Sequence, residues 1–146
     1  MSKSIWRDFA LAVLSGVLAS LLSLVIWTWK EARDKEAEIS CPILQDVRVV
    51  EKTIAALRRG ELIEDQNWPI LPVLGNIHPM IALVPADLRP KVLELQDRWL
   101  NLRSANLNRV LRGDEPPPQG GDYVGIGDAQ QLSQALAAAL SSRCDQ

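Results

Sequence analysis

Side chains that carry catalysis or bind metals are scarce in this sequence of 146 residues. It has one histidine, His78, and no cysteine, aspartate or glutamate lies at metal-ligand spacing from it. We therefore predict a structural role for His78 in a turn, and no metal or other cofactor. Acid–base and nucleophilic catalysis usually needs several convergent groups of these kinds. We expect a protein that is not an enzyme and has no small-molecule substrate. A lipid-associated enzyme with its site near His78 is the less favoured alternative.

Cysteine is limited to Cys41 and Cys144, near the two ends of the region that follows residue 29. They form no CxxC motif, which argues against a redox-active site. Two such thiols are compatible with a reduced cytosolic domain or with one disulfide in an oxidising compartment. The sequence leaves open whether Cys41 and Cys144 are free or bonded to each other.

A charge excess of either sign is also missing, since 16 basic and 18 acidic residues give a net charge of −2. This balance provides no basic field for nucleic acid. Four arginines, Arg98, Arg103, Arg109 and Arg112, do share one predicted helix, but no aromatic platform is interleaved with them. We expect them to form salt bridges within the domain, and expect no nucleic-acid partner. The helical carboxylates are expected to face solvent; they are Asp46, Glu51, Glu94 and Asp97.

Alternating runs of β-branched residues are nearly absent, so the sequence predicts an all-α protein. The N-terminal segment 1–29 contains an uncharged stretch from Phe9 to Trp29. As a helix it would be roughly 31 Å long, which matches the hydrocarbon core of a bilayer. Trp6, Trp27 and Trp29 flank it, as expected at the headgroup level. The stretch is too long for a signal peptide and is followed by no small-x-small cleavage site. We predict a single transmembrane helix in a lipid bilayer.

The basic residues beside this helix give little information on its orientation. Lys3 and Arg7 precede it, whereas Lys30, Arg33 and Lys35 follow it. Because an N-terminus of about eight residues is easily translocated, the prediction places the C-terminal domain in the cytoplasm.

Small residues recur at every fourth position of the predicted transmembrane helix. Ala12, Gly16 and Ser20 form one row, and Ala19 and Ser23 form a second row beside it. Such faces let membrane helices approach closely, which favours self-association or docking to another membrane subunit. The alternative is an ordinary lipid-facing helix whose serines bond back to their own carbonyls.

Two helices with one-sided apolar spacing are predicted after a charged helical stalk at 30–40. The first begins at a break at Ser40–Pro42, with Ser40 as N-cap, and ends at Gly60. The second is capped by Asp87 and ends at Gly113. We expect the two helices to pack antiparallel, as a hairpin domain over 41–112.

The last part of the chain is predicted to hold a linker and one more helix. Residues 113–127 are rich in proline and glycine, which is typical of a linker. The helix at 128–146 begins with Asp128 as N-cap and Gln131 three residues later, a variant of the capping box.

The connector 66–86 is a second uncharged stretch. Its four prolines exclude a regular membrane helix and favour short helical turns near 69–77 and 79–84. It either covers the hairpin as core or forms an exposed apolar patch that binds a partner. The residues of this candidate patch are Trp68, Ile70, Leu71, Val73, Leu74, Ile77, Met80 and Ile81.

These features predict a non-enzymatic, single-pass membrane-anchored interaction or accessory subunit. It would assemble, with itself or with other membrane subunits, through its transmembrane helix and its helical domain. A membrane-perturbing effector or lysis protein, acting by oligomerisation of its span, is the alternative.

Overall fold

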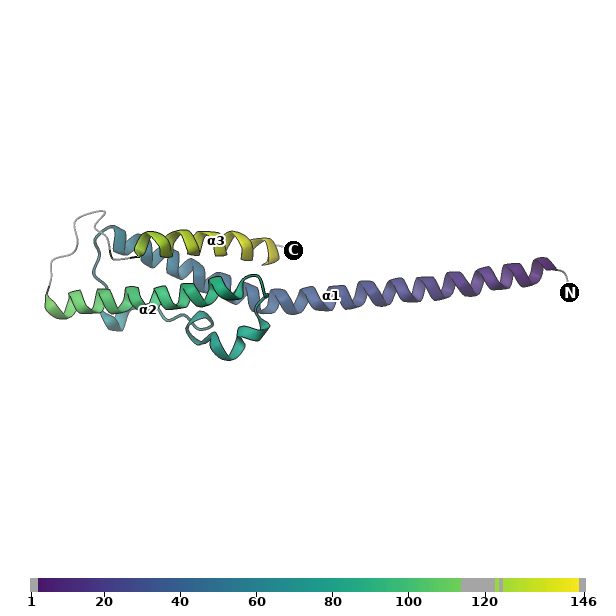
Figure 1. Cartoon of the computed structure of the whole chain (residues 1–146), viewed down its shortest axis with the longest axis horizontal. Helices are drawn as coiled ribbons and strands as arrows, with labels where there is room; N and C mark the ends of the chain where they lie inside the picture. The colour runs from purple at the N-terminus through teal and green to yellow at the C-terminus, as the bar shows by residue number, and fades with distance from the viewer. Residues whose placement is uncertain (1–2, 114–122, 124, 145–146) are drawn as a thin grey trace. The chain divides into compact units, whose positions relative to one another are not determined.

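The computed structural model describes residues 3–113, 123 and 125–144, and side chains from Leu11 onward. It has three α-helices: α1 (Lys3–Arg58), α2 (Arg89–Arg112) and α3 (Ile126–Cys144) (Figure 1). Three short 3-10 helices, η1 (Asp65–Asn67), η2 (Leu74–Asn76) and η3 (His78–Leu83), lie between α1 and α2. No strand occurs in the described residues, and the predicted all-α class is confirmed. Residues 1–35 form the N-terminal unit and residues 36–146 the C-terminal unit.

Helix α1 continues without a break through Pro42, so the predicted restart with Ser40 as N-cap is wrong. The proline removes one backbone hydrogen bond, the one to the carbonyl of Glu38. The apolar stripe nevertheless runs through it in register, because Ile39 is half-buried and Ile43 and Val47 are fully buried. Burial of this stripe outweighs the local cost of the proline.

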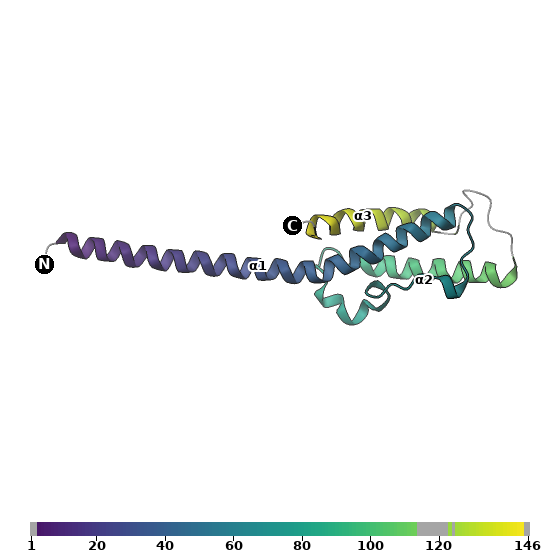
Figure 2. The same cartoon turned by 180° about the vertical axis from the view of Figure 1, so that it is seen from behind.

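In the C-terminal unit, α2 runs parallel to residues 36–58 of α1, and α3 runs antiparallel to both (Figures 1 and 2). At one end Arg143 of α3 pairs with Glu36 of α1 and with Asp87, just before α2. At the other end Arg58 of α1 donates a hydrogen bond to Gln130 of α3. The two amphipathic helices therefore do not form the expected antiparallel hairpin. About 30 residues separate α1 from α2, whereas helical hairpins use about 2–8, and this long connection brings the chain back before α2 begins.

The starts of α2 and α3 differ from the predicted ones. Asp87 does not cap α2, whose N-cap position is Leu88 and lacks a side-chain cap bond. The Asp87 carboxylate accepts a hydrogen bond from Arg143 instead. Helix α3 starts at Ile126, so Asp128 lies inside its first turn and does not cap it. Asp87 and Asp128, which the local sequence pattern predicted as helix caps, instead form ion pairs with the distant Arg143 and Arg98.

The two glycine stops are confirmed. Gly60 has a φ of 84° and Gly113 a φ of 67°. Both lie in the left-handed region, which glycine adopts without the steric penalty of a Cβ atom. Most of the predicted linker at 113–127 lies outside the described residues, and its last two residues belong to α3.

The core of the C-terminal unit is made by one face of each helix and by the connector. The predicted stripes of the two amphipathic helices are fully buried: Ile43, Val47, Val50, Ile54 and Leu57 in α1, and Leu88, Val92, Leu95, Trp99 and Leu102 at the start of and along α2. Trp68 of the connector stacks on Trp99 in a tilted arrangement with ring centroids 4.8 Å apart. Helix α3 adds Leu136, Ala137 and Leu140. The apolar spacing thus identified the core-facing residues even where it did not give the direction of the helices.

Candidate functional site

In the N-terminal unit, every described side chain from Leu11 to Lys30 is exposed. Among the described residues, α1 is the one helix that is long and apolar enough to cross a membrane, which supports a membrane protein with a single span. Trp27 and Trp29 are exposed near the end of the apolar stretch, and the guanidinium of Arg33 lies 4.5 Å from the centroid of a Trp29 ring. The side chain of Trp6 lies outside the described ones.

The small residues of the span share one face of α1, because spacings of three and four residues return to the same side of a helix. They are Ala12, Gly16, Ala19, Ser20 and Ser23. A Cβ atom added to Gly16 would meet no atom within 4 Å. One shallow groove beside this face is lined by Gly16 and Ser20, and another by Ala19, Ser23 and Trp27. The side chains of this face are short enough for another helix to approach closely.

The hydroxyls on the span are satisfied within α1 itself. Ser20 donates to the carbonyl of Gly16 and Ser23 to the carbonyl of Ala19, each at 2.9 Å. Ser15 donates in the same way to Ala12. This is the back-bonding that the sequence left open for the serines. The small-residue face therefore offers close packing more than hydrogen bonds to a neighbour.

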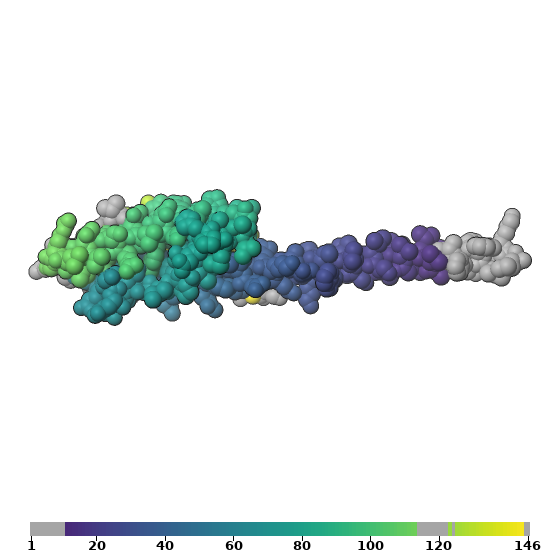
Figure 3. Space-filling model, turned by 90° about the horizontal axis from the view of Figure 1, so that it is seen from below, coloured from purple at the N-terminus to yellow at the C-terminus, as the bar shows by residue number. Residues whose placement is uncertain are grey.

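The candidate patch of the connector is mostly core. Trp68, Leu71, Leu74 and Ile77 are buried, so the predicted partner patch is wrong for these four residues. Val73, Met80 and Ile81 are half-buried. Only Ile70 of the set is fully open to solvent, at 86% exposure. The predicted short helical turns occur as η2 and η3, and the buried apolar residues of this stretch belong to the same core cluster as those of α1 and α2. Figure 3 shows the outer surface of the connector, in teal, beside the green end of α2.

Asp46 of α1 holds the middle of the connector. Its carboxylate accepts the backbone N–H groups of Val73 at 2.8 Å and Leu74 at 2.7 Å, where η2 begins. The first N–H groups of a helical turn have no partner inside the turn, so a carboxylate satisfies them well. Asp46 is 5% exposed, and the prediction that it faces solvent is wrong.

Polar side chains of α2 hold the connector and the residues just before it. Asn106 accepts from the backbone N–H of Ile63 at 3.2 Å and donates to the carbonyl of the same residue. Gln96 donates to the carbonyl of Gly75 at 3.2 Å. Both residues are buried, and sequence reasoning missed them. Their burial could have been predicted from the sequence, because positions 96 and 106 lie three residues before and seven after Trp99, on the same apolar face of the helix.

Of the four arginines singled out in the sequence, Arg98, Arg103 and Arg109 have partners among the described residues of the C-terminal unit. Arg98 pairs with Glu94 at 2.7 Å and with Asp128 at 3.4 Å, and Arg103 pairs with Asp65 at 2.7 Å. The hydrogen bond to Glu94 is the main cause that raises the pKa of Arg98. The guanidinium of Arg109 lies 4.9 Å from the ring centroid of Tyr123, whose pKa is raised by burial and lowered less by this cation. The predicted internal salt bridges are confirmed for Arg98 and Arg103.

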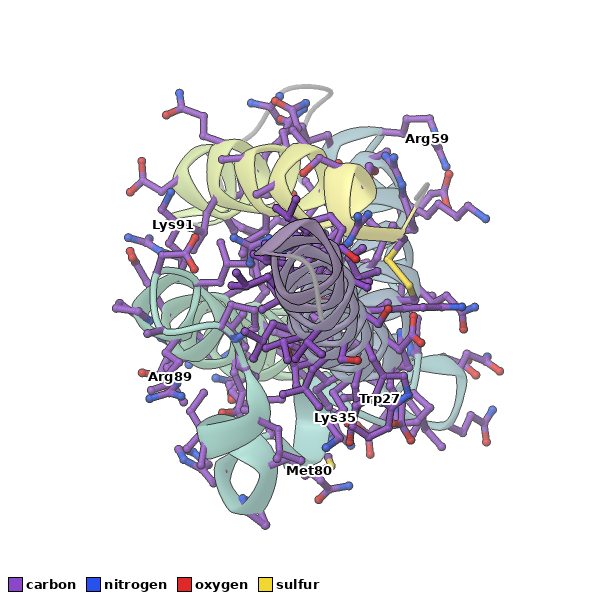
Figure 4. The ribbon with its side chains drawn as sticks, turned by 90° about the vertical axis from the view of Figure 1, so that its right-hand side faces the viewer. Trp27, Lys35, Arg59, Met80, Arg89 and Lys91 are labelled. Carbon is purple, nitrogen blue, oxygen red and sulfur yellow. A yellow bond between two sulfur atoms is a disulfide. The ribbon has the colours of Figure 1, made fainter. Side chains whose placement is uncertain are left out.

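Cys41 of α1 and Cys144, the last residue of α3, are joined by a disulfide, drawn as a yellow bond in Figure 4. Their Cα atoms are 5.5 Å apart. The adjacent Arg143 lies between two carboxylates, at 3.3 Å from Glu36 and 2.9 Å from Asp87. The end of α3 is therefore held by one covalent bond and two ion pairs.

His78 is exposed at the first position of η3. Within the described part of the chain, no three His, Cys, Asp or Glu side chains are placed to hold a metal ion together.

Comparisons with known proteins give no family for this chain. No protein-family model, curated protein or solved structure matches it.

Proposed function

We propose that this chain is a non-enzymatic, single-pass membrane-anchored subunit that assembles through α1 with itself or with another membrane protein. The observation that carries the proposal is the open small-residue face around Gly16, on a stretch of α1 (residues 11–30) in which every described side chain is exposed. In hydrocarbon, lipid tails are as apolar as leucine, so helices associate by close packing and not by burial from water. A glycine with open space around it permits the closest approach of two backbones.

The C-terminal unit supplies the part of the subunit that would contact other proteins. Its connector is held by Asp46 and Gln96, and Asn106 holds Ile63 just before it, so this surface is kept in one shape. On the outer side of α2, Leu100 is 50% exposed and Leu111 is more exposed still. These two leucines are among the side chains that a partner of this unit would cover.

No observation favours the alternatives. A membrane-perturbing protein would need a polar path through its span, yet the hydroxyls of Ser15, Ser20 and Ser23 are all bonded to their own helix. An enzyme near His78 would need a second group beside the imidazole, and among the described residues no three His, Cys, Asp or Glu side chains gather there.

The cytoplasmic position predicted for the C-terminal unit is a separate question from its assembly. It rested on the short N-terminus alone, and the disulfide between Cys41 and Cys144 favours the opposite side.

The test is the substitution Gly16→Ile in the full chain, reconstituted in lipid vesicles and measured by chemical cross-linking or energy transfer between labelled chains. A branched side chain in place of Gly16, which has none, would hold the two helices apart. We therefore expect association to weaken roughly tenfold or more, about 1.4 kcal/mol. If the partner is another membrane protein, co-purification from native membranes should fall by a similar factor.

Two control variants locate the interface. Leu14→Ile changes the opposite side of the same helix, at a residue that lines neither groove, and should leave association unchanged. Ser20→Ala removes a hydroxyl that is already bonded to Gly16 and should change association by less than about twofold. A wild-type chain that is monomeric and co-purifies with nothing, or equal effects of Gly16→Ile and Leu14→Ile, would overturn the proposal.

A further inference from the structure

We propose that the C-terminal unit lies on the oxidising side of the membrane, with the N-terminus on the cytosolic side, and that the Cys41–Cys144 disulfide is a permanent structural bond. This inference concerns the side of the membrane and does not depend on the assembly proposed for α1.

The fold brings the two sulfurs together independently of the bond between them. Leu136, Ala137 and Leu140 of α3 are buried in the core and set the register of the helix. Arg143 then fixes its last turn through Glu36 and Asp87. With α3 held in this way, the Cα atoms of Cys41 and Cys144 lie 5.5 Å apart, at the usual separation for a disulfide.

The position of the bond suits a structural staple. It joins residues 103 apart in sequence, so it encloses nearly the whole C-terminal unit in one covalent loop. A cross-link that closes a long loop removes much conformational entropy from the unfolded chain, although measured gains also depend on strain and solvation. The staple also holds the last helix to α1, beside a proline that weakens α1 locally.

A reversible redox switch is less consistent with these residues. The sequence holds no third cysteine that could resolve or exchange the bond, and no CxxC motif. Both cysteines are half-buried, and the helix faces around them would stay packed after reduction. A bond of this kind forms once, when the two thiols pass two electrons and two protons to an oxidised dithiol carrier.

Such bonds form and persist in oxidising compartments and are rare in the cytosol. The basic flanks of the span do not oppose this orientation. Lys3 and Arg7 on one side and Lys30, Arg33 and Lys35 on the other differ by a single positive charge. The disulfide therefore decides an orientation that the charges leave nearly tied.

The experiment uses the full chain expressed in bacterial cells, with a cleavable tag after Gln146. Cells are quenched with acid, and the denatured chain is alkylated with a maleimide that shifts its mobility on a gel, with or without prior reduction. We expect no labelled thiol before reduction and two after it. In parallel, spheroplasts with an intact inner membrane are treated with a protease that removes the tag, and we expect removal without lysis.

A double variant, Cys41→Ser with Cys144→Ser, controls both measurements. It should take no label in either condition and should still lose its tag in intact spheroplasts, because the orientation is set by the span. The purified wild-type chain should lose roughly 10 °C of melting temperature on reduction, whereas the double variant should not respond to reductant. Thiols that are labelled in unreduced cells, or a tag that is removed only after lysis, would overturn the proposal.

Discussion

Helix α1 contains two apolar stretches that differ in how their side chains are used. In residues 11–29 all described side chains are exposed, and the apolar residues surround the helix. In residues 36–58 the apolar residues recur every three or four positions and are buried, while charged residues such as Arg48 and Lys52 remain exposed. The first stretch is suited to lipid on all sides, and the second needs protein on one side only. Apolar content therefore predicts the surroundings of a helix, and apolar spacing predicts its packing face.

The largest expected effect comes from the same substitution made in both stretches. Leu57→Ala removes a side chain that is 1% exposed in the core, whereas Leu22→Ala removes one that is 60% exposed. We expect Leu57→Ala to lower the free energy of unfolding of the C-terminal unit by about 3 kcal/mol or more, because it leaves a cavity. Leu22→Ala should change it by less than about 0.5 kcal/mol. Urea unfolding in detergent, followed by near-ultraviolet circular dichroism, measures both, and equal effects would contradict the distinction between the two stretches.

A buried carboxylate should matter more than a surface one on the same helix. Asp46→Ala leaves the N–H groups of Val73 and Leu74 without their acceptor, so we expect a loss of about 2–3 kcal/mol. Glu51→Ala breaks only the exposed pair with Arg48 at 3.0 Å and should cost about 0.5 kcal/mol. Hydrogen exchange at the amides of Val73 and Leu74 would rise in the first variant alone. A loss below 1 kcal/mol for Asp46→Ala would show that the connector is held by its apolar residues.

Replacing the proline in α1 would measure what it costs the helix, because the buried residues around it stay the same. Pro42→Ala restores a backbone N–H inside the helix, and we expect it to stabilise the C-terminal unit by about 1–2 kcal/mol in the same urea measurement. A destabilised variant would instead mean that the path of α1 toward Ile43 and Val47 requires the proline.

The smallest expected effect concerns Tyr123, whose buried hydroxyl has no hydrogen-bond partner among the residues that the structure describes. Burial raises its pKa, so the unfolded chain ionises first as the pH rises past about 10, the ordinary value for tyrosine. Its contribution to stability is complete below that pH and is lost as the pH rises through the folded-state pKa. Tyr123→Phe should therefore change stability at pH 7 by less than about 1 kcal/mol and should reduce the alkaline loss. An unchanged alkaline loss in the variant would assign it to other groups.

The sequence was sufficient for features that depend on spacing within one element. The uncharged stretch from Phe9 to Trp29, the buried stripes of α1 and α2 and the glycine stops at Gly60 and Gly113 follow from local periodicity and backbone preference. The internal pairing of Arg98 and Arg103 followed from a balanced net charge. Each of these depends on residues a few positions apart, or on composition alone.

The features that the sequence reading missed depend on contacts between distant segments. Ser40 and Asp87 have the residue types of N-caps, but tertiary packing continues one helix past Ser40 and pairs Asp87 with Arg143. Asp46 was expected in solvent because its partners are backbone groups 27 and 28 residues away. The sequence did contain a signal for the parallel course of α2, since a connection of about 30 residues is too long for a hairpin, and for the amides Gln96 and Asn106, which lie on an apolar helix face.

The disulfide also determines what a single break in the chain would do. Because Cys41 and Cys144 are bonded, the C-terminal unit is joined to the span both through the backbone of α1 and through α3. One protease cut anywhere between these two residues would leave both fragments covalently attached to the anchor. Release of any piece would require a second cut or a reductant, so the C-terminal unit can be nicked without being shed from the membrane.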